Sequence, residues 1–423
     1  MKEPKIRFKE FQGEWEETSL GKLSTNYKYG INAAAIPYDG TNKYLRITDI
    51  DENTRMFSQE DLTSPGTDLS CCNEYLLEEG DITIARTGAS VGKSYIYHLS
   101  DGKVYFAGFL IRTRLNENVD KDYVFYSTLT DKYAKYIRLV SQRSGQPGVN
   151  VEELKGYTFN LPCDKAEQQK IASYFQHLDT LIQSTTKKIE SLKQVKAASL
   201  QSMFPQEGET TPRVRFKGFE GEWEETPFSE TFYYLKNNSL SRAELSDGGV
   251  VMNIHYGDVL IKYGECVDVC KEVKTFVKEE YIAKRLHQSC AITNGDIIFA
   301  DAAEDNTVGK CSEIIANEDD AIISGLHTIP CRPMKQFATR YLGYYLNSDA
   351  YHNQLLPHIQ GTKISSISKK AISQTHINSP LDISEQRAIA SYFTTLDRQI
   401  TLQSQRLEKL KQIKAACLDN MFV

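Results

Sequence analysis

Residues 86–95, RTGASVGKSY, are the part of this chain that comes closest to a phosphate-binding loop. Such a loop has four residues between its first glycine and the Gly-Lys-Ser, and its backbone amides hold a phosphate at the start of a helix. Here only three residues separate Gly88 from Gly92. One hypothesis is therefore a nucleotide-binding enzyme that uses the near match at 88–94.

Two observations argue against nucleotide binding at this segment. The residues that follow it, 95–97, are Tyr-Ile-Tyr and favour a strand, whereas phosphate binding needs a helix there. A second stretch, DAAEDNTVGK at 301–310, has the same Val-Gly-Lys but places Glu304 and Asp305 where a phosphate would have to lie. The pattern predicts two strands joined by a tight turn, in which glycine supplies a positive φ.

No other pattern of reactive side chains indicates a catalytic or metal site. The eight histidines are dispersed, and the nine cysteines include no CxxC pair. HExxH, GxSxG and paired-acid nuclease patterns do not occur. An aminomethyltransferase needs a glycine-rich cofactor loop and an Asn- or Asp-Pro-Pro-aromatic motif, and Asn378-Ser379-Pro380 is no substitute. We therefore expect no catalytic residues, no metal site and no cofactor in this chain.

Composition is that of an ordinary cytoplasmic protein. The chain has 423 residues, of which 40% are hydrophobic, and neither a signal sequence nor an apolar run long enough to cross a membrane. Its net charge of −6 argues against non-specific binding to nucleic acid but permits specific binding through one basic face.

The chain contains two copies of one sequence unit. IRFKEFQGEWEETSL at 6–20 returns as VRFKGFEGEWEETPF at 214–228 with the only two tryptophans, and the segment 167–204 returns at 385–422 with more than half of its positions identical. Between the copies, PQEGETTPRV at 205–214 has the composition of a solvated linker. The predicted division is 1–163 and 207–380 for two bodies, with 164–206 and 381–423 for two conserved helices.

The conserved segments read as long helices without proline or glycine, about 57 Å each at 1.5 Å per residue. Spacings of three and four residues define a narrow seam that also contains polar residues at matched places. Its apolar members are Leu178, Ile182, Ile189 and Leu192 in the first copy and Leu396, Ile400, Leu407 and Leu410 in the second. We favour pairing of the two helices as a coiled coil over packing of each on its own body.

Between the conserved ends, the two bodies share a pattern but little sequence. Each has a Gly-Asp before an apolar strand, a Val-Gly-Lys turn, a tyrosine-rich helix and a glycine-containing loop, at Gly145 and Gly361. Amide, guanidinium and aromatic groups in such loops can read base edges or stack on bases. The alternative interpretation is that these loops only connect the elements on either side. Matched ends with divergent middles suggest one scaffold carrying two separate reading surfaces.

At this point the sequence resembles the specificity subunit of type I restriction-modification systems along essentially its whole length. The two GEWEE segments, the hairpins at 80–93 and 295–310 and the paired EQxxIASYFxxLD helices carry the resemblance. It implies an α+β fold with two mixed α/β target recognition domains in tandem, joined by two long helices that pair as an antiparallel coiled coil.

The same resemblance implies a non-catalytic protein that binds double-stranded DNA, two modification subunits and restriction subunits. S-adenosylmethionine, ATP and Mg²⁺ would belong to those partner subunits. We expect the DNA-facing side to include Arg86, Lys93, Arg143 and Gln146 in the first body and Lys310 and Lys363 in the second. A coiled-coil adaptor without a DNA role is the other alternative.

Overall fold

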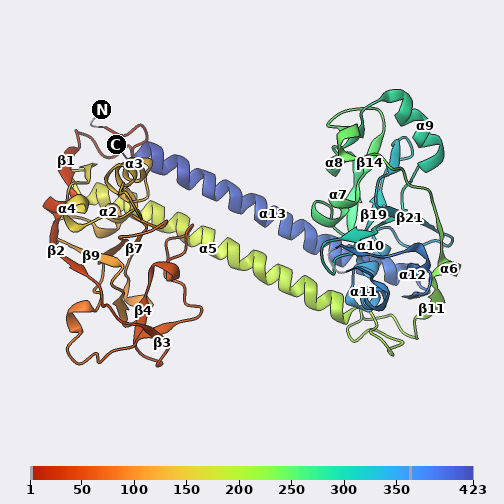
Figure 1. Ribbon diagram of the computed structural model, residues 1–423, viewed down its shortest axis with the longest axis horizontal. Helices are drawn as coiled ribbons and strands as arrows, with labels where there is room; N and C mark the ends of the chain where they lie inside the picture. The colour runs from red at the N-terminus through yellow and green to blue at the C-terminus, as the bar shows by residue number, and fades with distance from the viewer. Residues whose placement is uncertain (1–2, 362–363, 423) are drawn as a thin grey trace. The chain divides into compact units, whose positions relative to one another are not determined.

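The structure, a computed structural model of the chain, describes residues 3–361 and 364–422. It contains two compact units (Figure 1). Unit 1 comprises residues 1–187 with 404–423, and unit 2 comprises residues 188–403. Each unit thus contains one body and a part of both long helices, α5 (Lys165–Ser202) and α13 (Ile383–Met421). No helix of the described part of the chain is both long and apolar enough to span a membrane.

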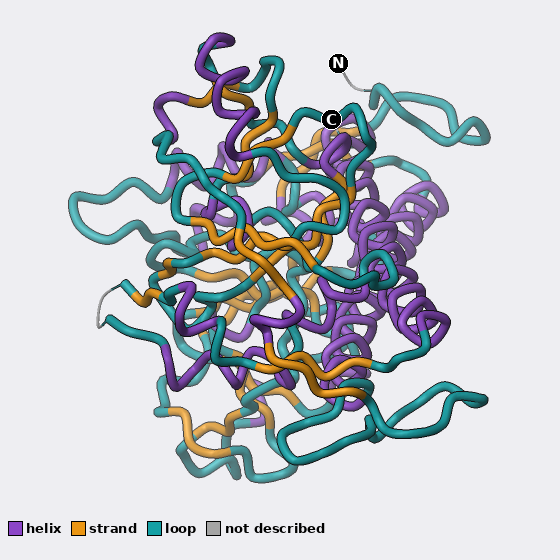
Figure 2. The backbone as a smooth tube through the Cα atoms, turned by 90° about the vertical axis from the view of Figure 1, so that its right-hand side faces the viewer, coloured by secondary structure: helices purple, strands orange, loops and turns teal. Residues whose placement is uncertain are grey.

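Unit 1 is built on short strands joined by loops. Figure 2 shows such short strands (orange) and loops (teal) throughout the part of the chain outside the helices. Its strands are β1 (Glu16–Ser19), β2 (Ser24–Tyr29), β3 (Ala35–Pro37), β4 (Lys43–Leu45), β5 (Thr63–Pro65), β6 (Ile82–Ala85), β7 (Ser94–Ile96), β8 (Val104–Phe106), β9 (Leu110–Leu115) and β10 (Thr158–Leu161). Its helices besides the long ones are α1 (Leu20–Leu23), α2 (Lys121–Ser127), α3 (Asp131–Val140) and α4 (Val151–Lys155). The central sheet is antiparallel in the order β2-β9-β6-β7.

Unit 2 repeats this plan with a larger body. Its strands are β11 (Glu224–Pro227), β12 (Phe232–Tyr234), β13 (Leu245–Ser246), β14 (Met252–Ile254), β15 (Cys266–Asp268), β16 (Phe276–Val277), β17 (Ile297–Ala300), β18 (Ala302–Ala303), β19 (Cys311–Ile315), β20 (Ile322–Ser324), β21 (Thr328–Pro333), β22 (Ser365–Ser366) and β23 (His376–Ser379). Its shorter helices are α6 (Phe228–Thr231), α7 (Tyr256–Ile261), α8 (Val269–Glu272), α9 (Glu280–Cys290), α10 (Tyr341–Leu346), α11 (Asp349–Leu355) and α12 (Lys369–Ile372). The main sheet runs β12-β21-β17-β19-β15, beside a second sheet in the order β13-β16-β14-β20.

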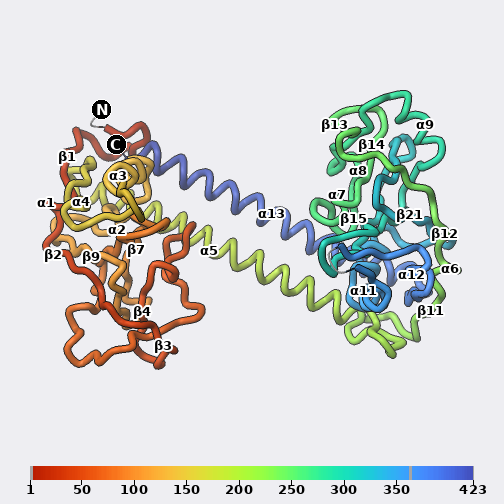
Figure 3. Tube along the Cα trace, viewed as in Figure 1, coloured from red at the N-terminus to blue at the C-terminus, as the bar shows by residue number. Residues whose placement is uncertain are grey.

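The opening segment of each copy closes its unit by pairing with the strand that precedes a long helix. β1 pairs antiparallel with β10, where Thr18 faces Phe159, and β11 pairs antiparallel with β23, where Thr226 faces Ile377. The end of α13 returns to the same unit as the N-terminal segment, as the trace in Figure 3 shows, and the amide of Ile6 donates to the carbonyl of Asn420. The repeated sequence therefore produces a repeated closure.

The Gly-Asp pairs of the sequence position the central strands. Asp81 lies just before β6 and accepts two hydrogen bonds, at 2.9 and 2.8 Å, from the guanidinium of Arg114 on β9. Asp296 lies just before β17 and accepts the same two bonds, at 2.6 and 2.7 Å, from Arg332 on β21. Both carboxylates are buried, so each needs its arginine to balance the charge. The motif is structural in both copies.

A second arginine-carboxylate pair fastens each tryptophan segment to the start of a long helix. Arg7 donates to both oxygens of Glu167 at 2.7 and 2.8 Å, and Arg215 donates to both oxygens of Glu385 at the same distances. The two glutamate side chains are each 2% exposed. These contacts explain why both copies of the EQxxIASYF motif begin with a glutamate.

The residues of the predicted seam are buried or partly buried. Leu178, Ile182, Ile189 and Leu396 are buried, and the other four apolar seam residues are partly buried. Within unit 1, Asp179 of α5 bonds to Lys414 of α13, and Tyr174 contacts Cys417. Partner numbers on α13 fall as those on α5 rise, so the helices run antiparallel.

Unit 2 shows the same antiparallel pairing, built on the polar positions of the seam. Lys196 of α5 donates to Asp397 of α13 at 2.6 Å and to Glu265 at 2.9 Å. Tyr344 of α10 donates to the same aspartate at 2.7 Å. Burial alone would lower the pKa of Lys196, but the two carboxylates hold it above its usual value. In unit 1, Tyr126 of α2 completes the equivalent network by donating to Asp179 at 2.9 Å.

We predict a pH dependence of stability from Glu313, which is buried beside the first turn of α10 and accepts the amides of Arg340 and Gly343. Burial raises its pKa from 4.5 to about 7. The folded state therefore holds this proton more tightly than the unfolded state, so the contribution of Glu313 is most favourable below pH 4.5 and is lost as pH rises through 7. The loss is on the order of 3 kcal/mol. Urea unfolding of the wild type and of Glu313→Gln across this range should show a difference that changes with pH, and parallel curves would contradict the prediction.

Candidate nucleic-acid interface

The segment 86–95 is a hairpin turn, as the sequence comparison predicted. β6 and β7 pair antiparallel on either side of it, and a strand follows the lysine in both copies. Gly92 has φ +85° and donates its amide to the carbonyl of Ala85, and Gly309 has φ +87° and donates to Ala300. Because no helix begins here, the segment lacks the amide cradle that binds phosphate.

The lysines of the two Val-Gly-Lys turns bond to groups of their own bodies, where Lys93 is buried and Lys310 is partly buried. The ammonium of Lys93 donates to the carbonyl of Ile50 at 2.9 Å and to Glu52 at 2.6 Å, with its side chain only 5% exposed. Lys310 donates to the carbonyls of Leu260 and Tyr263, both at 2.9 Å, and burial lowers its pKa. This placement speaks against the expected DNA-facing role of both lysines. Each instead fixes a loop of its own body.

The glycine of each turn has a packing role that a substitution should reveal. A Cβ on Gly92 would stand 2.7 Å from Cγ2 of Ile137, and one on Gly309 would stand 2.7 Å from Cδ1 of Leu355. We expect Gly92→Ala to lower the free energy of unfolding by about 1–3 kcal/mol through positive-φ strain and overpacking. Gly40→Ala is the matched control, since Gly40 has φ +85° and nothing within 4 Å of the added carbon. Equal losses in the two variants would show that the clash contributes nothing.

Arg86 follows β6 and is held by its backbone at the edge of the hairpin. Its amide donates to the carbonyl of Phe109 at 3.0 Å, and its carbonyl accepts from Val149 at 2.8 Å. The guanidinium carbon lies 4.8 Å from the ring centroid of Tyr29, which is a cation–π distance. The side chain is partly exposed. A stacked guanidinium with free edges suits recognition of a planar base.

An open cleft of about 550 Å³ lies next to Arg86 in unit 1, and we call it the Phe109 cleft. Phe109, between β8 and β9, is 60% exposed on its wall. The polar side chains that line it belong to Asn32, Arg46, Thr48, Thr87 and Gln146. This combination of amides, hydroxyls, a guanidinium and an exposed ring is typical of surfaces that contact bases.

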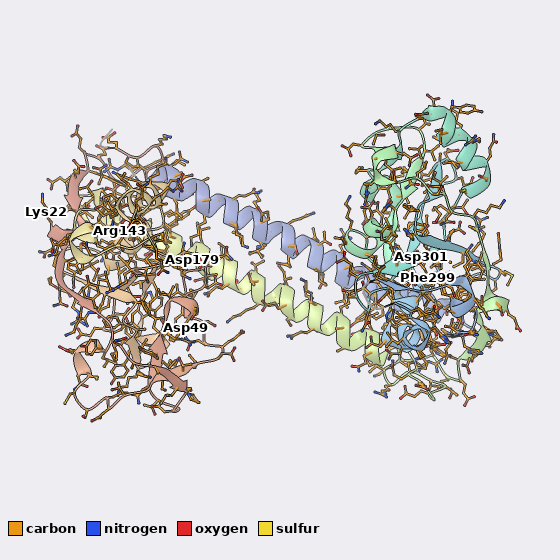
Figure 4. The ribbon with its side chains drawn as sticks, in the orientation of Figure 1. Lys22, Asp49, Arg143, Asp179, Phe299 and Asp301 are labelled. Carbon is orange, nitrogen blue, oxygen red and sulfur yellow. The ribbon has the colours of Figure 1, made fainter. Side chains whose placement is uncertain are left out.

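Gln146 reaches this cleft from the glycine-containing loop. Its Nε2 lies 2.9 Å from where a Cβ on Gly88 would stand, so the glycine leaves room for the amide. Arg143, which precedes Gln146 on the same loop, is instead held by Glu153 and by the carbonyls of Val140 and Gln142 (Figure 4). Gln146 and Thr87 therefore line the cleft, Arg86 precedes Thr87 at its edge, and Arg143 lies outside the lining. Lys363 lies outside the described residues.

Three other residues of this cleft could not be inferred from the sequence pattern. Arg46 and Thr48 come from a loop without periodicity, where Asp49 accepts two bonds from Arg46 at 2.9 and 2.7 Å. Phe109 is an aromatic residue in the turn between two strands, and that position was the one available signal. Their convergence depends on contacts between segments far apart in the chain.

Unit 2 presents the same backbone with different chemistry. Asp301 follows β17 as Arg86 follows β6, and its amide donates to the carbonyl of His327 at 3.1 Å. The ring of His327 stands 3.1 Å from the carboxylate of Asp301 through Nδ1, and edge-on to Tyr256 with centroids 5.2 Å apart. Figure 4 shows Asp301 just beyond Phe299 of the strand. Unit 2 therefore has a carboxylate at the position where unit 1 has a guanidinium.

Comparison with known proteins agrees with this duplicated architecture. Residues 13–194 and 220–412 both match the family described as type I restriction modification DNA specificity domain. The chain is 22% identical over 355 residues to the type I restriction enzyme MjaVIII specificity subunit of Methanocaldococcus jannaschii, which covers 81% of this chain and 78% of that protein. It is 23% identical over 194 residues to the HindI specificity subunit of Haemophilus influenzae, covering 45% and 41% of the two chains.

Solved structures show the same fold. The S subunit of a type I restriction-modification system from M. genitalium superposes with a TM-score of 0.61 at 14% identity, covering 100% of this chain and 99% of that one. A chain from work on complex assembly and conformational transition of the type I R-M system gives 0.53 at 15% identity, with 96% of both chains covered. With both bodies matched by the family and the tandem fold shared, the chain belongs to the type I restriction-modification DNA specificity family.

Proposed function

We propose that this chain reads a bipartite DNA target, with each body recognising one half-site and the long helices setting the non-specific spacer between them. Recognition of a DNA target is the general role of the family. The observation that carries the finer proposal is the pairing of an identical scaffold with different exposed chemistry. The buried Asp-Arg contacts are the same in both units and the lysine of each Val-Gly-Lys turn bonds to its own body, while the residues after β6 and β17 are Arg86 and Asp301.

The Phe109 cleft is the proposed contact surface of unit 1. Arg86 and Gln146 offer the bidentate groups that recognise guanine and adenine edges in the major groove. Thr48 and Thr87 offer hydroxyls to either partner, and Phe109 offers an apolar face that suits a thymine methyl group. Several weak contacts of this kind, spread over two bodies, give specificity without a strongly basic chain.

We further propose that the chemistry resides in partner subunits. Two modification subunits would carry S-adenosylmethionine and methylate adenine, and restriction subunits would use ATP and Mg²⁺. The net charge of −6 supports this division, because it leaves the isolated chain without the attraction that drives non-specific binding and makes its DNA affinity depend on the assembly.

The test is to express the chain with the modification subunits of its own system in a host free of other adenine methylation, and to sequence the modified adenines. A gapped motif of two short defined sequences, lost when this chain is omitted, is the expected result. A contiguous motif would contradict the bipartite arrangement, and methylation that does not depend on this chain would contradict the recognition role.

A further inference from the structure

Positions 86 and 301 are structurally equivalent to the level of individual hydrogen bonds. Arg86 donates its amide to Phe109 at 3.0 Å, and Asp301 donates its amide to His327 at 3.1 Å. The carbonyl of Arg86 accepts from Val149 at 2.8 Å, and that of Asp301 accepts from Ile367 at 2.9 Å. The two backbones are therefore fixed in the same way by the turn before β9 or β21 and by the loop after α3 or α11.

The next residue in each copy supports the equivalence of positions 86 and 301. Thr87 forms a β-bridge with Gly148, and Ala302 pairs with Ser366 in the β18–β22 ladder. Both copies thus place the residue after the central strand between the same two neighbouring segments. The backbone bonds of Arg86 and Asp301 are equivalent, so the difference between the two positions lies mainly in the side chains.

At two other pairs of equivalent positions, where the side chain makes structural contacts, both copies have the same residue type. The buried Asp81 and Asp296 are both aspartate, and the internal Lys93 and Lys310 are both lysine. At 86 and 301 the charge reverses, although the backbone is preserved. The shared scaffold therefore requires neither the positive charge of Arg86 nor the negative charge of Asp301. We infer that each charge serves a role other than folding.

Both residues are partly exposed to solvent and their side chains have aromatic or imidazole neighbours. Arg86 stacks on Tyr29, with Phe109 exposed beside it. Asp301 is 28% exposed and His327 is 51% exposed. His327 has φ +54°, a strained conformation for a residue with a side chain and one that concentrates at functional sites. Stacking and strain both hold a polar group in one orientation, as base recognition needs.

We propose that Arg86 and Asp301 are equivalent specificity-determining residues, of which Arg86 selects guanine and Asp301 selects cytosine. The inference rests on the proposed function and goes further by naming a base for one position of each half-site. A guanidinium has two parallel donors that match O6 and N7 of guanine. A carboxylate only accepts, so it suits the N4 amino group of cytosine and is repelled by a backbone phosphate.

The experiment uses the full chain assembled with its modification subunits, and compares methylation rates on DNA in which one target position is varied at a time. With Arg86→Ala, we expect the preference for guanine at one position of one half-site to fall by roughly 5- to 150-fold, and every other position to keep its preference. Asp301→Ala should do the same to a cytosine position in the other half-site. Arg86→Gln should shift the first preference towards adenine, which a glutamine amide pairs with.

The controls are Lys22→Ala in unit 1 and Asp319→Ala in unit 2, both of which remove an exposed charge. They should leave the motif unchanged. A uniform decrease on all sequences in the Arg86 and Asp301 variants would mean phosphate or scaffold contacts and would overturn the inference, as would relaxation at bases other than guanine and cytosine. A wild type that gives no gapped motif would overturn the proposed function and this inference with it.

Discussion

Removal of seven residues from each long helix, 184–190 from α5 and the equivalent 402–408 from α13, is expected to shorten the spacer of the methylated motif and to leave both half-sites unchanged. Seven residues preserve the phase of the seam, and they shorten each helix by about 10 Å. Since B-DNA rises about 3.4 Å per base pair and also turns with each pair, the expected change is about one to three base pairs.

Sequencing of modified adenines measures the spacer directly. The matched control removes four residues from α5 alone, which breaks the phase against α13 and should abolish methylation or unfold the chain. A shortened pair of helices that methylates at the original spacing would show that the helices do not set the distance. Loss of the half-site sequences themselves would show that the helices also shape the reading surfaces.

Arg215→Met is expected to lower the free energy of unfolding of unit 2 by about 3–5 kcal/mol, because it leaves the 2%-exposed carboxylate of Glu385 without its cation. The double variant Arg215→Met with Glu385→Gln should lose much less, since it removes the buried charge as well. Arg213→Met, at an arginine that is 60% exposed and pairs with Glu209, should cost no more than about 1 kcal/mol.

The two tryptophans allow each unit to be followed by itself. Trp15 belongs to unit 1 and Trp223 to unit 2, so urea unfolding by fluorescence in a Trp15→Phe background reports unit 2 alone. The mirror experiment, Arg7→Met in a Trp223→Phe background, should give a similar loss in unit 1 because the Arg7–Glu167 pair has the same geometry. A double variant as unstable as the single one would contradict the buried-charge explanation.

Sequence reasoning predicted the features that depend on local pattern. The seam followed from spacings of three and four residues, and the structure buries Leu178, Ile182 and Ile189 as that spacing requires. The hairpin at 86–95 followed from comparing two copies, because the same turn recurs with acidic residues in the second. Duplication supplied a second observation for each of these predictions, which a single-copy chain would not have offered.

The environment of the turn lysines depends on contacts between segments far apart in the chain, which a local sequence pattern does not indicate. The sequence places Lys93 in a hairpin turn of the first body, where we expect it to face DNA. It is buried because the carbonyl of Ile50 and the carboxylate of Glu52, about forty residues earlier, converge on its ammonium. Nothing near Lys93 in the sequence indicates these partners.

Only part of the proposed DNA-contact surface could be predicted from the sequence, because it too is formed by segments far apart in the chain. Arg86 and Gln146 stood beside recognisable turns, so their types and positions could be noted. Arg46, Thr48 and Phe109 lie on loops that share no period, and the cleft exists only once those loops are folded together. Recognition residues are free to vary because the scaffold does not depend on them, which also removes the pattern by which they could be found.

The discontinuous composition of unit 1 has a consequence for synthesis on the ribosome. Leu418 and Met421 of α13 belong to the same core as Trp15 and Phe175. Unit 2 is one continuous segment and can complete its contacts as soon as residue 403 has emerged. Unit 1 therefore completes its core only after residues 404–423 have emerged, later than unit 2.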